Sequence, residues 1–398
     1  MNKTEKFLLA TLAVVQFTHI MDFMIMMPMS EILMKLFKIS PDEFGMLVSA
    51  YNITAFVSCL LSISFIDRFE RKKLLIAMYS GFIIGTFLCG LAPSYATLFL
   101  ARVVAGFFGG VLSALILSII GDAFSADRRG RAMGIVMLGF SAAAILGVPV
   151  GFYLANQFNW HIPFVIVGTI ALLNLFLIAR LIPDMPLKKE NVQGSTFSKI
   201  KQILSNKPQM FALLLTLCIV FSQFLTIPFI TPYIVRNVGI PKEYVSLVYL
   251  VGGAFTVFSS PLIGKLSDKH GKFRVLLVLS CVAILPILAL TNLPVVSLWV
   301  VLTVTSLFFI FVAGRMIPAM ALVTATTSSE GRGVFMSINS ATQQLSSGLA
   351  SFVAGSIIVE LPDKMLLNYD YVGYLSVFMA IIAVGIAFMV QRKISEKP

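Results

Sequence analysis

Residues 65–73, FIDRFERKK, and residues 264–274, GKLSDKHGKFR, are two versions of one short basic loop. Asp67 and Asp268 hold equivalent places in them and lie 201 residues apart. The same spacing of 201 recurs in two other regions, where it relates Gly130 to Gly331, Arg131 to Arg332, and Gly147 to Gly348. One spacing that serves three regions predicts two parallel repeats of a single structural unit.

The composition places these repeats in a membrane. Of the 398 residues, 58% are hydrophobic and 12% are charged, whereas soluble domains carry about 25% charged residues. The apolar residues come in runs of about 20, the length that crosses roughly 30 Å of hydrocarbon. The sequence therefore predicts an all-α membrane protein and excludes a soluble chain of two or three domains.

The apolar runs predict twelve transmembrane helices in two six-helix bundles. The predicted helices cover residues 7–35, 44–66, 74–92, 96–124, 132–155, 162–182, 210–235, 245–266, 275–291, 295–323, 334–359 and 371–391. The longest connector, residues 184–208, is basic and rich in helix-breaking residues. It predicts a cytoplasmic linker between an N-terminal bundle, residues 1–183, and a C-terminal bundle, residues 209–398.

The basic residues indicate the topology. The formal net charge is +12, but 23 Lys and Arg fall on one set of loops and termini and five on the other. Such asymmetry follows the positive-inside rule, which places both termini in the cytoplasm and the chain in the cell inner membrane. It also argues against nucleic acid as the partner of the positive charge.

The first loop resembles the signature of the major facilitator superfamily, which has the form G-x-x-x-D-R-x-G-R-K. The matching residues are Asp67, Arg68, Arg71 and Lys72. Ile63 and Glu70 stand where the family usually has Gly. The segment LARVVAGFFGG, with Arg102 and Gly106, resembles the family's R-x-x-x-G element. Two further motifs resemble those of the family's drug and metabolite:H⁺ antiporters, namely GVPVG with Gly147, Pro149 and Gly151, and NWHIPF, in which His161 replaces Arg.

A candidate transport site lies on the first predicted helix, in QFTHIMDFMIMMP, residues 16–28. Three- and four-residue spacing brings to one helix face Gln16, His19, Asp22 or Phe23, and Met26. Burial favours a neutral aspartic acid and a nearby guanidinium favours the carboxylate, so Asp22 is a candidate proton carrier. The alternative is a fixed ion pair that ties this helix to its neighbour. Glu31 is a rival carrier nearer the end of the helix.

Two arginines lie inside apolar runs, where an ionisable side chain costs about 2.5–3.5 kcal/mol. The resemblance implies that Arg102 faces the first helix and takes part in proton coupling; the alternative is a clamp on backbone carbonyls or on Glu31. Arg315 has no counterpart in the first repeat. It is a candidate for an anionic substrate group or for gating, or it extends to the cytoplasmic surface. Further candidate substrate ligands are Gln223, Asn339 and Gln343.

The loop residues form a second group of candidates. The resemblance implies that they close the cytoplasmic side in one conformation, and the alternative is that they only set topology. This predicted gating group comprises Asp67, Arg68, Arg71, Asp268, Arg131 and Arg332. Gly147, Pro149 and Gly151 are predicted to allow a close helix contact with a local bend.

The predicted function is secondary transport. No phosphate-binding loop, metal-ligand cluster or nucleophile–base pair is found in the sequence, so no cofactor and no enzymatic activity are expected. The favoured function is a monomeric proton-coupled antiporter that exports small amphipathic drugs or metabolites by alternating access, with protons and the lipid bilayer as its other partners. The alternative is a proton-linked importer or facilitator of a specific nutrient or organic anion. A membrane receptor that transports nothing is disfavoured because the chain has almost no soluble part.

Overall fold

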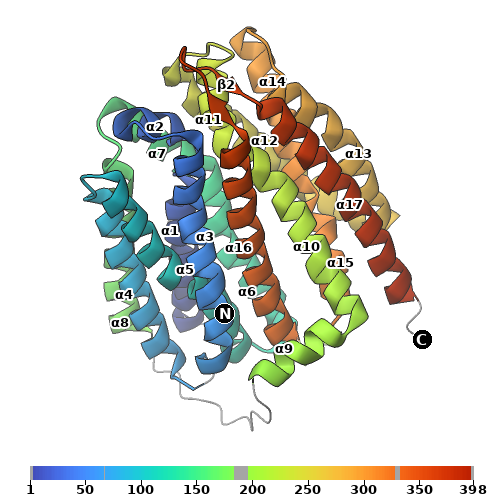
Figure 1. The fold of residues 1–398 in the computed structure, drawn as a ribbon. Coiled ribbons are helices and arrows are strands. Elements are labelled where there is room, and N and C mark those ends of the chain that lie inside the picture. The colour runs from blue at the N-terminus through green and yellow to red at the C-terminus, as the bar shows by residue number, and fades with distance from the viewer. Residues whose placement is uncertain (1–2, 67, 183–195, 328–331, 396–398) are drawn as a thin grey trace. The chain divides into compact units, whose positions relative to one another are not determined.

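The computed structural model describes residues 3–66, 68–182, 196–327 and 332–395, most of them helical (Figure 1). The chain forms two compact units. Unit 1 comprises Met1–Ile25, Ala50–Lys199 and Met336–Gln344, and unit 2 comprises Met26–Ser49, Ile200–Phe335 and Leu345–Pro398. Part of the predicted linker, 184–208, lies outside the described residues, and the division of the chain at that point stays a prediction.

Unit 1 is built from helices of the first half of the chain. They are α1 (Lys3–Met24), most of α3 (Pro41–Phe65), α4 (Arg71–Gly90), α5 (Tyr95–Ala123), α6 (Ala126–Ala142), the π-helical turn η1 (Ala143–Gly147), α7 (Val148–Gln157), α8 (Ile162–Leu181) and the start of α9 (Thr196–Ser205). Its core is apolar and joins α1, α4, α5, α6 and α8, with Leu12, Phe82 and Leu115 fully buried.

Unit 2 holds most of the second half. Its helices are α2 (Ser30–Phe37), α10 (Lys207–Thr226), η2 (Ile227–Phe229), α11 (Ile230–Arg236), η3 (Lys242–Tyr244), α12 (Val245–His270), α13 (Lys272–Thr291), α14 (Leu298–Phe308), η4 (Phe309–Ala313), α15 (Met316–Ala325), most of α16 (Arg332–Ile357) and α17 (Tyr369–Ser395). Between α16 and α17, β1 (Val359–Glu360) and β2 (Leu366–Leu367) form an antiparallel hairpin.

Equivalent helices pack together in the two units. In unit 1, α1 packs on α8, and α4 packs on both α5 and α8. In unit 2, α10 packs on α17, and α13 packs on both α14 and α17. These pairings follow the order of the helices in each half, as the spacing of 201 residues predicts. The fold is the all-helical architecture of two six-helix bundles expected from the sequence.

The predicted helix over residues 7–35 is wrong in one respect, because α1 ends at Met24 and α2 begins at Ser30. Pro28 lies in the intervening turn, where its missing N–H cannot continue the helix. Prolines also coincide with changes of helix type elsewhere. Pro228 lies in the 3₁₀ turn η2, and Pro149 follows the π-helical turn η1. Such irregular turns within membrane helices often mark functional regions.

Eleven helical stretches in the described part of the chain are long and apolar enough to cross a membrane. The twelfth long helix, α16, has 26 residues but is not among them. Its sequence contains Asn339, Gln343 and Gln344 together with several serines. Large apolar side chains such as Trp299, Phe258 and Leu285 are exposed on the outside of unit 2, as lipid-facing residues are.

Glycines allow the closest helix contacts. A Cβ on Gly85 of α4 would lie 2.6 Å from the backbone nitrogen of Ala105 and 2.7 Å from its Cα. We therefore expect Gly85→Ala to destabilise the protein by about 1–3 kcal/mol through overpacking. Thermal unfolding in detergent measures the change. Gly134→Ala in α6 is the matched control, because a Cβ there meets nothing within 4 Å. Equal changes in the unfolding temperature of the two variants would contradict overpacking at Gly85.

Candidate functional site

Unit 1 contains a fully buried ion pair between α1 and α5. Asp22 lies in the last turn of α1, and Arg102 lies in α5. Both residues have 0% exposure, and Arg102 Nη1 donates to Asp22 Oδ2 at 2.8 Å. The same nitrogen donates to the backbone oxygen of Asp22 at 3.2 Å. Thr86 of α4 donates from its hydroxyl to the other carboxylate oxygen at 3.0 Å. Three helices thus meet at one carboxylate.

An aromatic surface flanks the ion pair. The guanidinium carbon of Arg102 lies 4.2 Å from the ring centroid of Tyr51, a cation–π contact from α3. Phe23, the neighbour of Asp22, stacks on Tyr51 with ring centroids 5.5 Å apart. Arg102 is therefore held by a carboxylate and by an aromatic face.

Several buried polar atoms beside the pair have no hydrogen-bond partner among the described residues. They are both ring nitrogens of His19, the hydroxyl of Tyr51 and Nε of Arg102. The His19 ring lies 6.4 Å from that of Tyr51 and 6.0 Å from that of Phe82. Buried polar groups without partners are uncommon and call for an explanation. A hydrogen-bonding substrate, water or a moving proton would provide one.

Glycines of α5, η1 and α7 set the shape of this region. A Cβ on Gly106 would come within 2.3 Å of the Tyr51 backbone oxygen, so α5 and α3 are in direct backbone contact. A Cβ on Gly147 would lie 2.7 Å from Met21 Sδ, and one on Gly151 would lie 2.4 Å from Met21 Cε. The GVPVG motif therefore packs on the residue next to Asp22. Pro149 is buried within the same segment.

Glu31 has an arginine partner of its own. It lies in α2, within unit 2, and Arg236 Nε donates to its carboxylate at 2.5 Å. The predicted alternative partner of Arg102 therefore has a different arginine, and Arg102 is paired with Asp22.

Arg315 is a buried cation in unit 2. It has 0% exposure, so it does not extend to the surface as one sequence alternative held. Its Nε donates to the Val312 oxygen at 3.4 Å, and Nη2 donates to Ser222 Oγ at 3.3 Å. Nη1 has no partner among the described residues. Ser222 also bonds Ser376 of α17, so Arg315 joins a polar contact between α10 and α17.

The other predicted substrate ligands fall in both units. Gln16 of α1 is buried, and α16 carries a fully buried Asn339 and a partly buried Gln343; all three belong to unit 1. Met26 is fully buried and Gln223 is partly buried, and both belong to unit 2.

The predicted gating residues are only partly described. Asp67 and the side chain of Arg332 lie outside the described residues, whereas Arg68, Arg131 and Asp268 are exposed. Arg71 Nε donates to Asp122 Oδ2 of α5 at 2.8 Å, and Arg71 also contacts the Ile66 carbonyl. The first basic loop is thus attached to the end of α5, a partner that the motif alone does not name.

A family model described as Major Facilitator Superfamily matches residues 12–351 and again residues 212–398. The chain belongs to the major facilitator superfamily. It is therefore a multi-pass integral membrane protein of a family of transporters, which are in general carriers and not enzymes. The chain is 26% identical over 336 residues to YceJ of Bacillus subtilis strain 168, an uncharacterised MFS-type transporter. The match covers 84% of this chain and 85% of YceJ.

Solved structures of this superfamily share the fold. One is a bacterial homologue of the human lysosomal transporter Spinster in an inward-facing, unoccupied conformation. It has a TM-score of 0.79 and 17% identity, and the match covers 100% of this chain and 98% of that one. The nucleoside transporter NupG has a TM-score of 0.76 and 14% identity, with 98% of this chain and 100% of that chain covered.

The Asp22–Arg102 pair predicts unequal effects of truncation. Asp22→Leu leaves a buried guanidinium that cannot lose its proton, so we expect the free energy of unfolding to fall by about 3–5 kcal/mol. Arg102→Met should cost less, because the abandoned carboxyl can become neutral by taking up a proton. The free energy of unfolding of the double variant should be close to that of Arg102→Met. Unfolding of the purified protein in detergent measures all three, and additive losses would contradict the coupling.

Proposed function

We propose that this transporter is a proton-coupled antiporter that exports small amphipathic compounds by alternating access. It acts as a monomer in the cell inner membrane with both termini in the cytoplasm, the orientation favoured by its basic loops. The observation that carries the proposal is the fully buried contact of 2.8 Å between Asp22 and Arg102.

A carboxyl group in this setting can carry a proton through the transport cycle. Burial opposes its charge, whereas Arg102 and the hydroxyl of Thr86 stabilise that charge. A small change in the distance between Asp22 and Arg102 shifts the balance between the charged and the protonated forms of Asp22, because charge interactions are strong where water is excluded. Proton uptake at Oδ2 of Asp22 breaks the ion pair. The free energy of the pair is thereby coupled to the conformation of the helices that hold it.

The surroundings of the pair suit an amphipathic substrate. Phe23 and Tyr51 offer stacked aromatic surface, and His19 adds hydrogen-bonding nitrogens that have no partner among the described residues. Ligand sites commonly combine apolar lining with a few polar groups. Substrate binding that moves Arg102 toward Asp22 would release the proton and complete the exchange.

A second candidate function is supported by Arg315. Its guanidinium is fully buried, and among the described residues it makes two long hydrogen bonds to neutral oxygens. An unpaired cation in a membrane is a default candidate for function, here for the negative group of an organic anion. The alternative is therefore a proton-linked importer or facilitator of an organic anion or nutrient.

Asp22→Asn tests the coupling. The amide keeps the size and hydrogen-bonding capacity of the carboxyl group but cannot titrate, so flux driven by a pH gradient should be abolished. Binding or passive exchange of substrate should remain measurable. Glu5→Gln is the matched control, because Glu5 also pairs with an arginine, Arg128, at 2.6 Å but is partly exposed. Proteoliposomes with an imposed pH gradient and cationic and anionic lipophilic dyes provide the measurement.

The direction of flux separates the candidates. Antiport of the cationic dye against protons supports export, and symport of the anionic dye supports the alternative. Flux through Asp22→Asn at the wild-type rate under the gradient would exclude Asp22 as the essential proton carrier. Failure of both dyes to move in the wild-type protein under any gradient would count against both candidate functions.

The basic loops give a separate prediction. Asp67→Asn should slow transport several-fold while expression and thermal stability stay close to wild type, because the charge matters in one conformation of the cycle. The same dye flux and a thermal unfolding curve test it. Transport by this variant at full rate would reduce the motif to a topology signal.

A further inference from the structure

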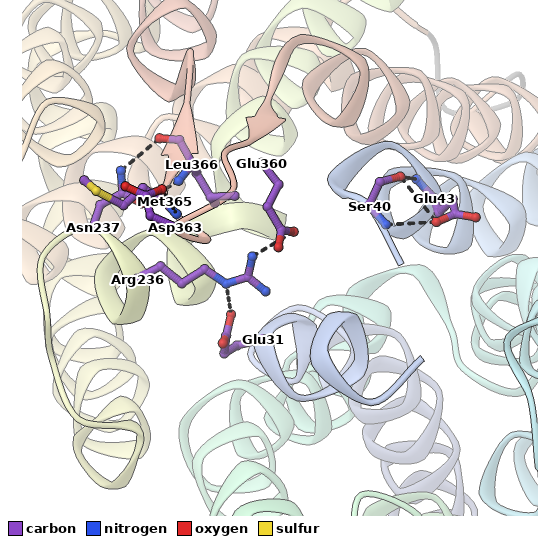
Figure 2. Close-up of polar contacts among 9 residues, drawn as sticks. All are labelled: Glu31, Ser40, Glu43, Arg236, Asn237, Glu360, Asp363, Met365 and Leu366. Carbon is purple, nitrogen blue, oxygen red and sulfur yellow. Dashed lines mark hydrogen bonds and ion pairs between the residues drawn. The ribbon is translucent and has the colours of Figure 1, made fainter. Parts of the chain in front are cut away.

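Arg236, the last residue of α11, has its guanidinium between two carboxylates (Figure 2). Nε donates to Oε2 of Glu31 at 2.5 Å, and Nη1 lies 2.9 Å from Oε2 of Glu360. The side chains of Arg236 and Glu31 are each 8% exposed, and that of Glu360 is 30% exposed. The contact between Arg236 and Glu31 is a shielded charge-assisted hydrogen bond, which is stronger than a surface ion pair. Nη1 and the partly exposed Glu360 form an ion pair that is not a hydrogen bond.

The cluster joins three segments that are distant in sequence and belong to unit 2. Glu31 lies in the first turn of α2, and Glu360 is part of β1. Arg236 is 205 residues from Glu31 along the chain. One guanidinium therefore holds a helix of the first repeat and a hairpin of the second repeat to the end of α11.

The neighbouring residue Asn237 fixes the hairpin to α11. Its Nδ2 donates to the Leu366 carbonyl at 2.8 Å, and its Oδ1 accepts from the Leu366 N–H at 2.9 Å (Figure 2). Leu366 pairs with Glu360 across the two strands. Hydrogen bonds therefore hold the hairpin to α11, and the ion pair between Arg236 and Glu31 holds α2 to both.

The chain connects this attachment to the proton site. Nine positions separate Asp22 from Glu31, and the chain between them is the turn at Pro28. Ser30 closes that turn by donating from Oγ to the Met27 oxygen at 2.7 Å. Glu31 and the proposed proton carrier Asp22 therefore lie close together along the chain.

We propose that Glu31, Arg236 and Glu360 form a latch, which closes α2 onto α11 and the hairpin in one conformation and opens in each transport cycle. Alternating access requires contacts that are made in one conformation and broken in the other. Arg236 satisfies both carboxylates while the latch is closed, and water solvates the three charges when it opens. The latch acts whether or not protons drive the transporter.

Cysteine reactivity measures the opening without any substrate. Ser30 is fully buried beside Glu31, and Ser30→Cys is nearly isosteric. In a Cys281→Ala background, which removes the exposed native thiol, purified protein in nanodiscs is treated with a water-soluble maleimide. Labelling of the cysteine should become about tenfold faster or more in each of Glu31→Gln, Glu360→Gln and Arg236→Ala, because each breaks an ion pair of the latch.

Glu43→Gln is the matched control. Glu43 is a carboxylate at the start of α3 that caps its own helix, accepting from the Ser40 N–H at 2.8 Å. Labelling in this variant should stay at the reference rate. The open conformation is folded, so faster labelling should come without an equal loss of thermal stability, and Glu360→Gln tests this even if Arg236→Ala folds poorly. The latch would be overturned if the labelling rate did not change in the Gln variants. It would also be overturned if labelling became faster only in proportion to the loss of thermal stability, because the cluster would then be a permanent structural contact.

Discussion

The contact between Asp22 and Arg102 is the interaction on which the rest of the proposed transport site depends. Two full charges buried at 0% exposure are costly unless each satisfies the other. The structure meets that requirement with a direct hydrogen bond, a hydroxyl from Thr86 and an aromatic face from Tyr51. A pair so balanced is stable in one arrangement of α1, α4 and α5 and sensitive to any other arrangement.

Close helix packing makes that arrangement specific. The glycines of α5 bring it into backbone contact with α3, and Gly147 and Gly151 make room for Met21 beside the ion pair. A side chain at any of these glycines would displace the elements that position the charges. The same α1 segment leads through the turn at Pro28 to α2, so the proposed proton site and the proposed latch are adjacent along the chain.

The sequence predicted the all-helical membrane fold and the two charged residues of the ion pair, because apolar runs and intramembrane charge are local signals. It did not predict Thr86 and Tyr51, since a hydroxyl or an aromatic ring within an apolar helix gives no signal of its partner. Arg236 gives no signal of its own in the sequence for a related reason. Its burial depends on Glu31 and Glu360, which only tertiary structure brings to it.

The most direct test of the central claim is infrared difference spectroscopy of the purified transporter as the pH is changed, because it detects a protonated carboxyl group without any substrate. If Asp22 carries the proton, a carboxylic acid C=O band appears on acidification in the wild-type protein and is absent in Asp22→Asn. A band of equal intensity in both proteins, or no band from Asp22 at any pH at which the protein stays folded, would contradict the claim that Asp22 carries the proton.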